Sequence, residues 1–121
     1  MTAVGELMTE TPLTASSNDL VGTTRDALLN SGVHCVPVID DEGRPVGIVS
    51  SWDLVEEYAP QESIRNAMTT NVRTIGSHQE VEEAAVMMQT NFIHHLVVVD
   101  DSNHTIGFVS SLDLLTAILE R

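Results

Sequence analysis

Two serine–aspartate pairs have the residue types and the spacing best suited to a functional site. Ser50 lies three residues before Asp53, and Ser110 lies three residues before Asp113. A hydroxyl and a carboxylate at this spacing can cap the first turn of a helix, whose free N–H groups also attract anions. Helix capping and ligand contact are therefore both open from the residues alone, and the two roles are compatible.

The two pairs belong to an internal repeat with an offset of sixty residues. Both copies read Gly-x-Val-Ser-Ser-x-Asp-Leu at the pairs, and identical residues recur along the chain at the same offset. Examples are Met8/Met68, Thr14/Thr74, His34/His94, Val38/Val98 and Asp40/Asp100. Chance would supply roughly three or four identities over this length. The repeat predicts two copies of one domain, at residues 1–58 and 63–121, joined by a linker at 59–62.

Each copy is predicted to have the element order β-α-β-β-α, which makes the chain an α/β (α+β) protein. One apolar stripe, formed by Val81, Ala84 and Met88, marks the first helix of the second copy. Ser77 and Glu80 fit a capping box at the start of that helix. Because about sixty residues bury only a marginal core, we expect the two copies to pack sheet to sheet, related by a pseudo-twofold axis, with clefts between them.

Glycine, proline and asparagine residues predict where helices end, where a strand begins and where the chain turns. Gly32 is expected to end the first helix of the first copy. Pro37 lacks an N–H group, so we expect it at the start of its strand or on an unpaired edge. Gly43 and Asn103 occupy matching positions and favour hairpin turns, because both residue types tolerate positive φ. The last helices are expected from Ser51 to about Tyr58 and from Ser111 to about Glu120.

The composition favours a cytoplasmic protein with one shared core. Of the 121 residues 42% are apolar, but no apolar run is long enough to span a membrane, and Met1–Val4 does not resemble a secretory signal. Eighteen acidic residues stand against five basic ones, all Arg, for a net charge of −13. This balance argues against nucleic acid or a membrane as a partner, since both require a basic surface. The single cysteine, Cys35, excludes an intrachain disulfide.

The repeated pattern resembles the CBS domain, named after cystathionine β-synthase, present here as a tandem pair or Bateman module. The resemblance rests on Met-Thr at 8–9 and 68–69, on residues 33–40 and 93–100, and on the two Gly-x-x-Ser-x-x-Asp segments. It extends from about Val4 to Leu119. It implies a disc-like module that binds an adenosine-containing ligand in clefts between the repeats.

The resemblance also implies roles for individual residues. Asp53 and Asp113 would accept hydrogen bonds from ribose hydroxyls, with Ser50 and Ser110 near the ribose or phosphate. The strand start of the opposite repeat would flank the base. Carried over by position, Asp113 pairs with Val33, His34 and Cys35, and Asp53 pairs with Ile93, His94 and His95. The doubled histidine makes the cleft of Asp53 the expected better phosphate acceptor.

The scarcity of cations bears on the choice among AMP, ATP, NAD and S-adenosylmethionine. With five Arg and no Lys, AMP or the sulfonium S-adenosylmethionine fits better than ATP. Mg²⁺ is expected only if a polyphosphate is bound, to neutralise its charge. No cofactor is required, and the five histidines show no metal-ligand spacing.

Three classes of function are compared. The first is a regulatory sensor, present as a homodimer, that binds an adenosyl ligand and passes its occupancy to an unidentified partner protein. The alternative is a structural dimerisation module with empty clefts. Catalysis is disfavoured, because the sequence contains no Gly-x-Ser-x-Gly elbow, phosphate-binding Gly-rich loop or His-Glu-x-x-His motif.

The acidic composition generates a prediction about salt. Carboxylates without lysine keep a protein surface hydrated in brine, which supports the hypothesis of a halophilic source. We expect the melting temperature, followed by circular dichroism, to rise as KCl is increased into the molar range. A melting temperature that stays constant or falls would contradict this hypothesis.

Overall fold

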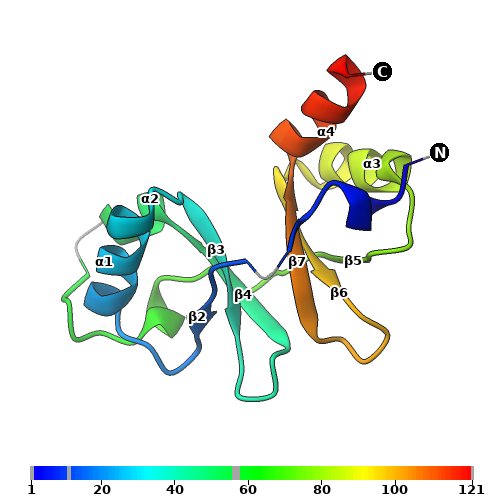
Figure 1. The fold of residues 1–121 in the computed structure, drawn as a ribbon. Coiled ribbons are helices and arrows are strands. Elements are labelled where there is room, and N and C mark those ends of the chain that lie inside the picture. Colours follow the sequence, from blue (N-terminus) through cyan, green and yellow to red (C-terminus); the bar gives the residue numbers. More distant parts are fainter. Residues whose placement is uncertain (1, 11, 56–57, 121) are drawn as a thin grey trace. The chain divides into compact units, whose positions relative to one another are not determined.

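The structure is a computed structural model that describes residues 2–10, 12–55 and 58–120. The elements derived from the first repeat are η1 (Val4–Glu6), β1 (Thr9–Glu10), β2 (Ala15–Ser16), α1 (Val21–Ser31), β3 (Cys35–Ile39), β4 (Pro45–Ser50) and α2 (Ser51–Val55). Those of the second are η2 (Ile64–Asn66), β5 (Thr74–Gly76), α3 (Val81–Asn91), β6 (His95–Val99), β7 (Thr105–Ser110) and α4 (Ser111–Leu119). The predicted order β-α-β-β-α is confirmed in both copies (Figure 1).

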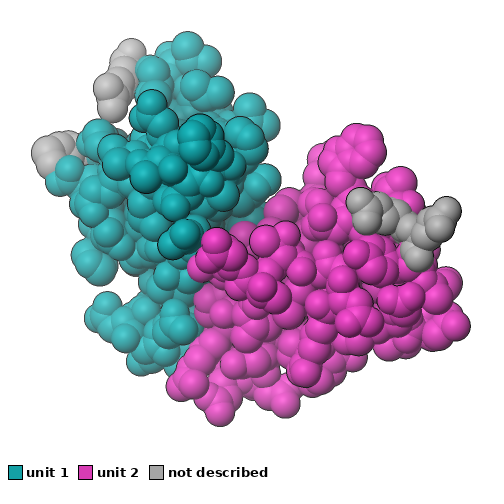
Figure 2. All heavy atoms as spheres, turned by 180° about the vertical axis from the view of Figure 1, so that it is seen from behind, with its two compact units in different colours: residues 1–12, 73–121 teal, residues 13–72 magenta. Residues whose placement is uncertain are grey.

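The chain divides into two compact units (Figure 2). Unit 2, residues 13–72, contains a three-stranded sheet in the order β2-β3-β4. Strand β2 runs parallel to β3, and β3 runs antiparallel to β4. Helices α1 and α2 lie on one face of this sheet (Figure 1). The core between helices and sheet contains Val21, Leu28, Val36, Val38, Val49 and Leu54.

Unit 1, residues 1–12 and 73–121, contains a four-stranded sheet in the order β1-β7-β6-β5. Helices α3 and α4 contribute to its core together with strands β6 and β7. The buried residues include Val81, Ala84, Met88, Leu96, Val98, Val109 and Leu114. The two units thus use matching positions of the repeat, such as Leu54 and Leu114, to close matching cores. None of the helices in the described ranges is long and apolar enough to cross a membrane.

The opening segment of each repeat belongs to the unit built on the other repeat's sheet. Segment η1 buries Val4 in the core of unit 1, and η2 buries Ile64 in the core of unit 2. The Val4 N–H donates to the carbonyl of Gln79 at 2.8 Å, within unit 1. Each compact unit therefore contains residues from both sequence repeats.

The two opening segments explain the glycine that begins each repeated motif. A Cβ atom added at Gly47 would lie 2.6 Å from Sδ of Met68 and 3.1 Å from the carbonyl oxygen of Thr69. At Gly107 an added Cβ would collide with the side chain of Met8. The Met-Thr pair and the motif glycine, far apart in the sequence, are therefore two sides of one contact in each unit.

The expectation for Pro37 is wrong. Pro37 lies inside β3, the central strand of its sheet, opposite Ile48 of β4. On its other side β2 pairs only with Val38 and Ile39, so no residue of β2 stands opposite the proline. At the matching position in unit 1, the Val97 N–H donates to the Arg73 carbonyl at 3.1 Å. Proline cannot make this bond, which explains why β2 is shorter than β5.

The predicted capping box at Ser77 is also wrong. Helix α3 starts one turn later, with Glu80 as its N-cap, and the Glu80 N–H donates to Oε1 of Glu83 at 3.4 Å. Ser77 lies in the turn after β5, where its carbonyl accepts the Gly5 N–H at 2.8 Å. Ser77 therefore lies outside the helix, where its carbonyl is bonded to η1, the opening segment contributed by the other repeat.

The other boundary expectations agree with the structure where it describes the residues. Gly32 ends α1 with a φ of 71°, and Gly43 and Asn103 have φ values of 80° and 65° in their turns. Helix α4 ends at Leu119, one residue before the expected end. Helix α2 is described to Val55, and residues 56–57 of its expected last turn lie outside the described residues.

A matched pair of substitutions tests the two helix ends. Phe92 ends α3 with a φ of 54°, where Gly32 stands in the other repeat, and its side chain is 92% exposed. Phe92→Gly is expected to raise the free energy of unfolding by about 0.5 to 1 kcal/mol, because glycine adopts positive φ without strain and little burial is lost. Urea denaturation measures the change.

The control is Gly32→Ala, where a Cβ would meet no atom within 4 Å, so only the positive φ opposes it. This variant is expected to lose about 1 kcal/mol. Equal stability of all three proteins would contradict the assignment of strain to Phe92.

Candidate functional site

The turn from β4 into α2 is held by Ser50 and Asp53. The Ser50 N–H donates to Oδ2 of Asp53 at 2.8 Å, and the Ser50 hydroxyl donates to the same oxygen at 3.0 Å. The Asp53 N–H in turn lies 3.3 Å from Ser50 Oγ. The strand therefore passes into the helix with no intervening loop, and the carboxylate is fixed at the junction.

The turn from β7 into α4 repeats this arrangement in unit 1. The Ser110 N–H donates to Oδ2 of Asp113 at 2.7 Å, and the Asp113 N–H donates to Ser110 Oγ at 3.2 Å. The capping role is thus confirmed for both pairs. Aspartate reaches the serine N–H although the longer glutamate is the usual partner in a capping box.

Capping occupies only one oxygen of each carboxylate. The hydrogen bonds that the two carboxylates accept all end on Oδ2, and Oδ1 of Asp53 and of Asp113 accepts none from residues 2–10, 12–55 or 58–120. Both aspartates are half-buried. Each turn therefore presents an oriented carboxylate oxygen that can accept hydrogen bonds from a hydroxyl-bearing ligand.

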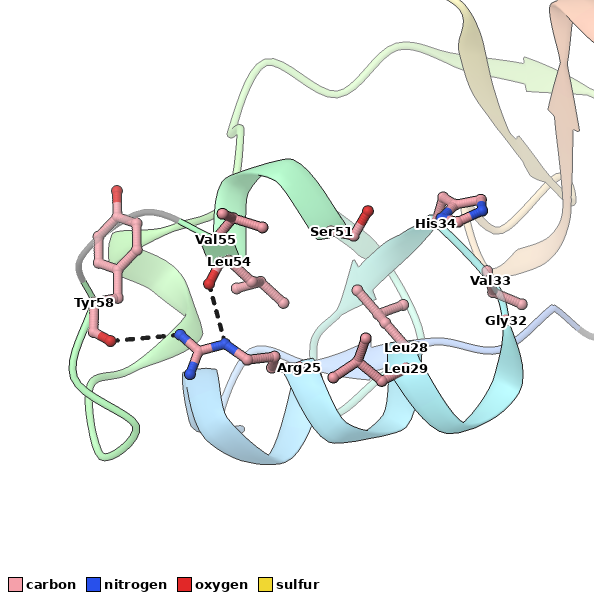
Figure 3. A pocket seen from close by; sticks show the side chains of 10 residues that line it. All are labelled: Arg25, Leu28, Leu29, Gly32, Val33, His34, Ser51, Leu54, Val55 and Tyr58. Carbon is pink, nitrogen blue, oxygen red and sulfur yellow. Dashed lines mark hydrogen bonds between the residues drawn. The ribbon is translucent and has the colours of Figure 1, made fainter.

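A cavity of about 570 Å³ lies beside the first turn in unit 2 (Figure 3). It runs between α1 and α2 and includes Ser51 and two of the predicted site residues, Val33 and His34. Its wall is mainly apolar, formed by Leu28, Leu29, Leu54 and Val55 together with Gly32, Arg25 and Tyr58. This volume is in the range of small-molecule sites.

A smaller hollow of about 350 Å³ occupies the matching place in unit 1. Every residue that lines it stands sixty positions after a residue lining the first cavity: Met88, Gln89, Phe92, Ile93, His94 and Ser111. The predicted site residues Ile93 and His94 therefore share this hollow, as Val33 and His34 share the first.

The remaining predicted residues gather at the turns, not in the cavities. Cys35 stands opposite Ser50 on the paired strands β3 and β4, and His95 stands opposite Ser110 on β6 and β7. Each lies close enough to the aspartate of its own repeat to feel its charge. The sequence-based pairing of each aspartate with the opposite repeat stays a prediction.

Arg25 is a lining residue that the sequence reasoning missed. Its Nε donates to the Leu54 carbonyl at 3.0 Å, and Nη2 lies 3.5 Å from the Tyr58 carbonyl (Figure 3). The guanidinium thus ties the end of α2 to α1 and closes one end of the cavity. The available signal was an arginine in the apolar stripe of α1, where the second repeat has Ala85.

The residues opposite the two serines differ in chemistry. Burial, with a smaller contribution from Asp53, raises the pKa of the Cys35 thiol to about 12. Burial and the neighbouring His94 lower the pKa of His95, while Asp113 opposes this shift. The His95 ring stacks on Phe108, with ring centres 5.1 Å apart and planes 7° from parallel. The first turn therefore has a neutral thiol, and the second has a titratable imidazole.

Two of the five arginine side chains are engaged in hydrogen bonds within the fold. Arg65, like Arg25, donates to a backbone carbonyl, that of Ser17, at 3.0 Å. Nη2 of Arg65 also lies 3.4 Å from Oδ1 of Asn18. Within the described ranges no three His, Cys, Asp or Glu side chains are grouped so that they could hold a metal ion.

Comparison with known proteins identifies the repeated unit. The family model described as CBS domain matches residues 4–60 and again residues 63–120. Among curated proteins, L-aspartate semialdehyde sulfurtransferase of Methanocaldococcus jannaschii is 31% identical over 115 residues, which are 94% of this chain and 23% of that protein. The chain thus spans about a quarter of the length of the curated relatives it matches.

Two crystal structures show the same fold over nearly the whole chain. The CBS domain pair of protein MJ0100, in complex with 5′-methylthioadenosine and S-adenosyl-L-methionine, is 30% identical. It has a TM-score of 0.88, with 99% of this chain and 98% of that chain covered. CBSX2 of Arabidopsis thaliana, in complex with AMP, has a TM-score of 0.87 at 24% identity and covers the same fractions.

The environment of Cys35 generates a prediction about reactivity. At a pKa of about 12 against an ordinary 9.0, the thiolate population of the folded protein is reduced. Alkylation by iodoacetamide at mildly alkaline pH, followed by mass spectrometry, is expected to be on the order of a thousandfold slower than in urea. Asp53→Asn should accelerate it only modestly, since burial is the larger cause. Equal rates in buffer and urea would refute the burial.

Proposed function

Because the chain belongs to the CBS domain family and carries two copies of that domain, we propose that it is a regulatory module that binds an adenosyl ligand. The observation that carries the proposal is the pair of oriented carboxylates, Asp53 and Asp113, each with Oδ1 accepting no hydrogen bond from the described residues. A ribose presents two adjacent hydroxyl donors. An ionised carboxylate held in place accepts such donors strongly, because hydrogen bonds to a charged group exceed neutral ones in strength.

The small number of available basic side chains favours a ligand with little negative charge. Arg25 and Arg65 already donate to backbone carbonyls, so few cations remain for a polyphosphate. The relative with 30% identity binds 5′-methylthioadenosine, which is uncharged, and S-adenosylmethionine. We therefore rank S-adenosylmethionine and 5′-methylthioadenosine first, AMP and NAD next, and ATP last and only with Mg²⁺. No cofactor is needed for this function.

The proposed mechanism is linkage, not catalysis. A ligand that binds one conformation of the module more tightly than another shifts the equilibrium towards it by that difference in affinity. A partner protein in the cytoplasm, of unidentified nature, would respond to the change. The Ser–Asp turns serve capping and recognition at once, and neither role requires a nucleophile or a general base.

A second candidate function, structural dimerisation, is favoured by exposed apolar side chains on the helices. On α2, Trp52 and Val55 are 80% and 71% exposed. On α4, Leu112, Leu115 and Leu119 are 71%, 52% and 83% exposed. Large apolar surfaces of this kind mark sites of association. We propose a homodimer in either case, and only ligand binding separates the two functions.

Isothermal titration with S-adenosylmethionine, 5′-methylthioadenosine, AMP, NAD and ATP tests the first function. We expect binding of at least the first ligand, and a loss of about ten- to hundredfold in affinity in Asp53→Asn/Asp113→Asn, since a hydrogen bond to a charge is worth about 1.5 to 3 kcal/mol. The side-chain oxygen of asparagine can still accept the serine N–H that each aspartate accepts, so the fold should survive. Absence of heat with all five ligands would favour the structural alternative.

The control for charge is Asp101→Asn, an exposed aspartate away from both turns. It removes one negative charge without touching a turn, and its affinity should equal that of the wild type. An equal loss in this variant would mean that net charge, and not the two turns, governs binding.

The single tryptophan allows ligand binding at each of the two turns to be followed separately by fluorescence. Trp52 lies next to Asp53, and Leu112 holds the matching exposed place next to Asp113. Fluorescence of the wild type is expected to respond to ligand at the first turn, and that of Trp52→Leu/Leu112→Trp to ligand at the second. A response that is unchanged in Asp53→Asn would contradict binding at the first turn.

A further inference from the structure

The cavity in unit 2 has an apolar wall and a positively charged end. Helix α1 supplies Leu28 and Leu29 to the wall, α2 supplies Leu54 and Val55, and Arg25 lies at one end (Figure 3). All five residues belong to unit 2, and the volume of the cavity is about 570 Å³. The cavity is therefore formed within one unit, beside the Ser–Asp turn and not by it.

Part of this wall is apolar surface that the fold leaves uncovered. Leu28 and Leu54 are buried in the core, but Leu29 and Val55 are 72% and 71% exposed. An apolar chain lying between α1 and α2 would cover both exposed side chains. Each CH₂ group that such a chain removes from water strengthens binding by about fourfold. The wall therefore favours a ligand with an apolar body.

The charged end is a guanidinium that the fold holds in place without a counter-ion. Arg25 is half-buried, with Nε 3.0 Å from the Leu54 carbonyl and Nη2 3.5 Å from the Tyr58 carbonyl. Its Nη1 has no hydrogen-bond partner among residues 2–10, 12–55 and 58–120, and no carboxylate of these residues pairs with it. The remaining N–H donors favour an anion, and a carboxylate matches the planar guanidinium best.

We propose that this cavity binds a fatty-acid-like carboxylate, with the apolar chain between α1 and α2 and the carboxylate on Arg25. This inference goes beyond the proposed function and does not rest on it. It involves a different class of ligand, and neither Ser50 nor Asp53 contributes a group to it. The other polar groups of the wall near the turn, His34 and Ser51, lie away from Arg25 (Figure 3).

Unit 1 lacks both features of the proposed site. Ala85 stands where unit 2 has Arg25, so the matching place carries no charge. The matching hollow has about 350 Å³, and Gln89 stands in it at the position of Leu29. We therefore expect one site for the carboxylate in each chain, in unit 2.

Isothermal titration of the wild-type chain with octanoate and 1-octanol at about pH 8 tests the proposal. The two probes share one apolar chain and differ in charge, and histidine is ordinarily neutral at this pH. We expect octanoate to bind at one site per chain, about tenfold more tightly than 1-octanol, because it adds a hydrogen bond between charged groups. Hexanoate, which is shorter by two CH₂ groups, should bind about tenfold more weakly than octanoate.

A pair of arginine variants separates the cavity from the general charge of the unit. Arg25→Met removes the charge and keeps an unbranched side chain, so octanoate should bind about ten- to hundredfold more weakly while 1-octanol binds as before. The matched control is Arg65→Met, which removes the same charge from unit 2, where Arg65 donates to the Ser17 carbonyl at 3.0 Å. Octanoate should bind this variant as tightly as the wild type.

Equal binding of octanoate and 1-octanol, or equal losses in Arg25→Met and Arg65→Met, would refute the assignment of Arg25. If octanoate does not bind the wild type, the inference falls, and S-adenosylmethionine titrated into the same preparation tests the proposed function independently. If octanoate does not bind and Leu29→Asp separates a dimer into single chains in sedimentation, a second copy of the chain occupies the cavity instead. The comparison of the two probes on the wild type decides the question even where Arg25→Met does not fold.

Discussion

The hydrogen bond from a serine N–H to Oδ2 of the aspartate three residues later is the constraint on which each unit depends. It joins β4 directly to α2 through Ser50 and Asp53, and β7 to α4 through Ser110 and Asp113. Because the chain turns without a loop, the helix is placed on its sheet and the core residue that follows the aspartate, Leu54 or Leu114, is buried. The same bond orients the second carboxylate oxygen.

The turns are supported from outside their own repeat. The opening segments place Met8 against Gly107 and Met68 against Gly47, on the strands that lead into the two turns. A side chain at either glycine would push this segment away, so the motif glycine is required by packing and not by its φ. Each unit consequently depends on residues from both copies of the sequence repeat, although each copy carries its own turn.

The sequence predicted the features that depend on local conformational preference and missed those that depend on contacts with distant segments. The order of elements, the helix end at Gly32 and the turns at Gly43 and Asn103 follow from local conformational preferences, and all were found. The position of Pro37 was predicted wrongly because a central strand tolerates proline where the neighbouring strand is too short to pair with it. No local sequence pattern shows the length of that neighbouring strand. Helix α3 starts later than predicted because the Ser77 carbonyl is bonded to Gly5 of η1, the opening segment of the other repeat. Long-range contacts thus account for both errors.

At the candidate site, the spacing of the residues identified both Ser–Asp pairs. The bond of Arg25 to the end of α2 could be found only from the fold.

The use of one carboxylate oxygen for structure, with the other still available, explains why we propose both capping and recognition for Ser-x-x-Asp. It also explains how two sites of common design can differ, since the residue opposite the serine, Cys35 or His95, is outside the capping bond. A crystal structure of the protein grown with S-adenosylmethionine would show whether the free carboxylate oxygens of the two turns bind the ligand. We expect ribose hydroxyls within hydrogen-bond distance of Oδ1 of Asp53 or Asp113, with Oδ2 still bound to the serine N–H. Ligand bound elsewhere, with Oδ1 of both aspartates untouched, would contradict it.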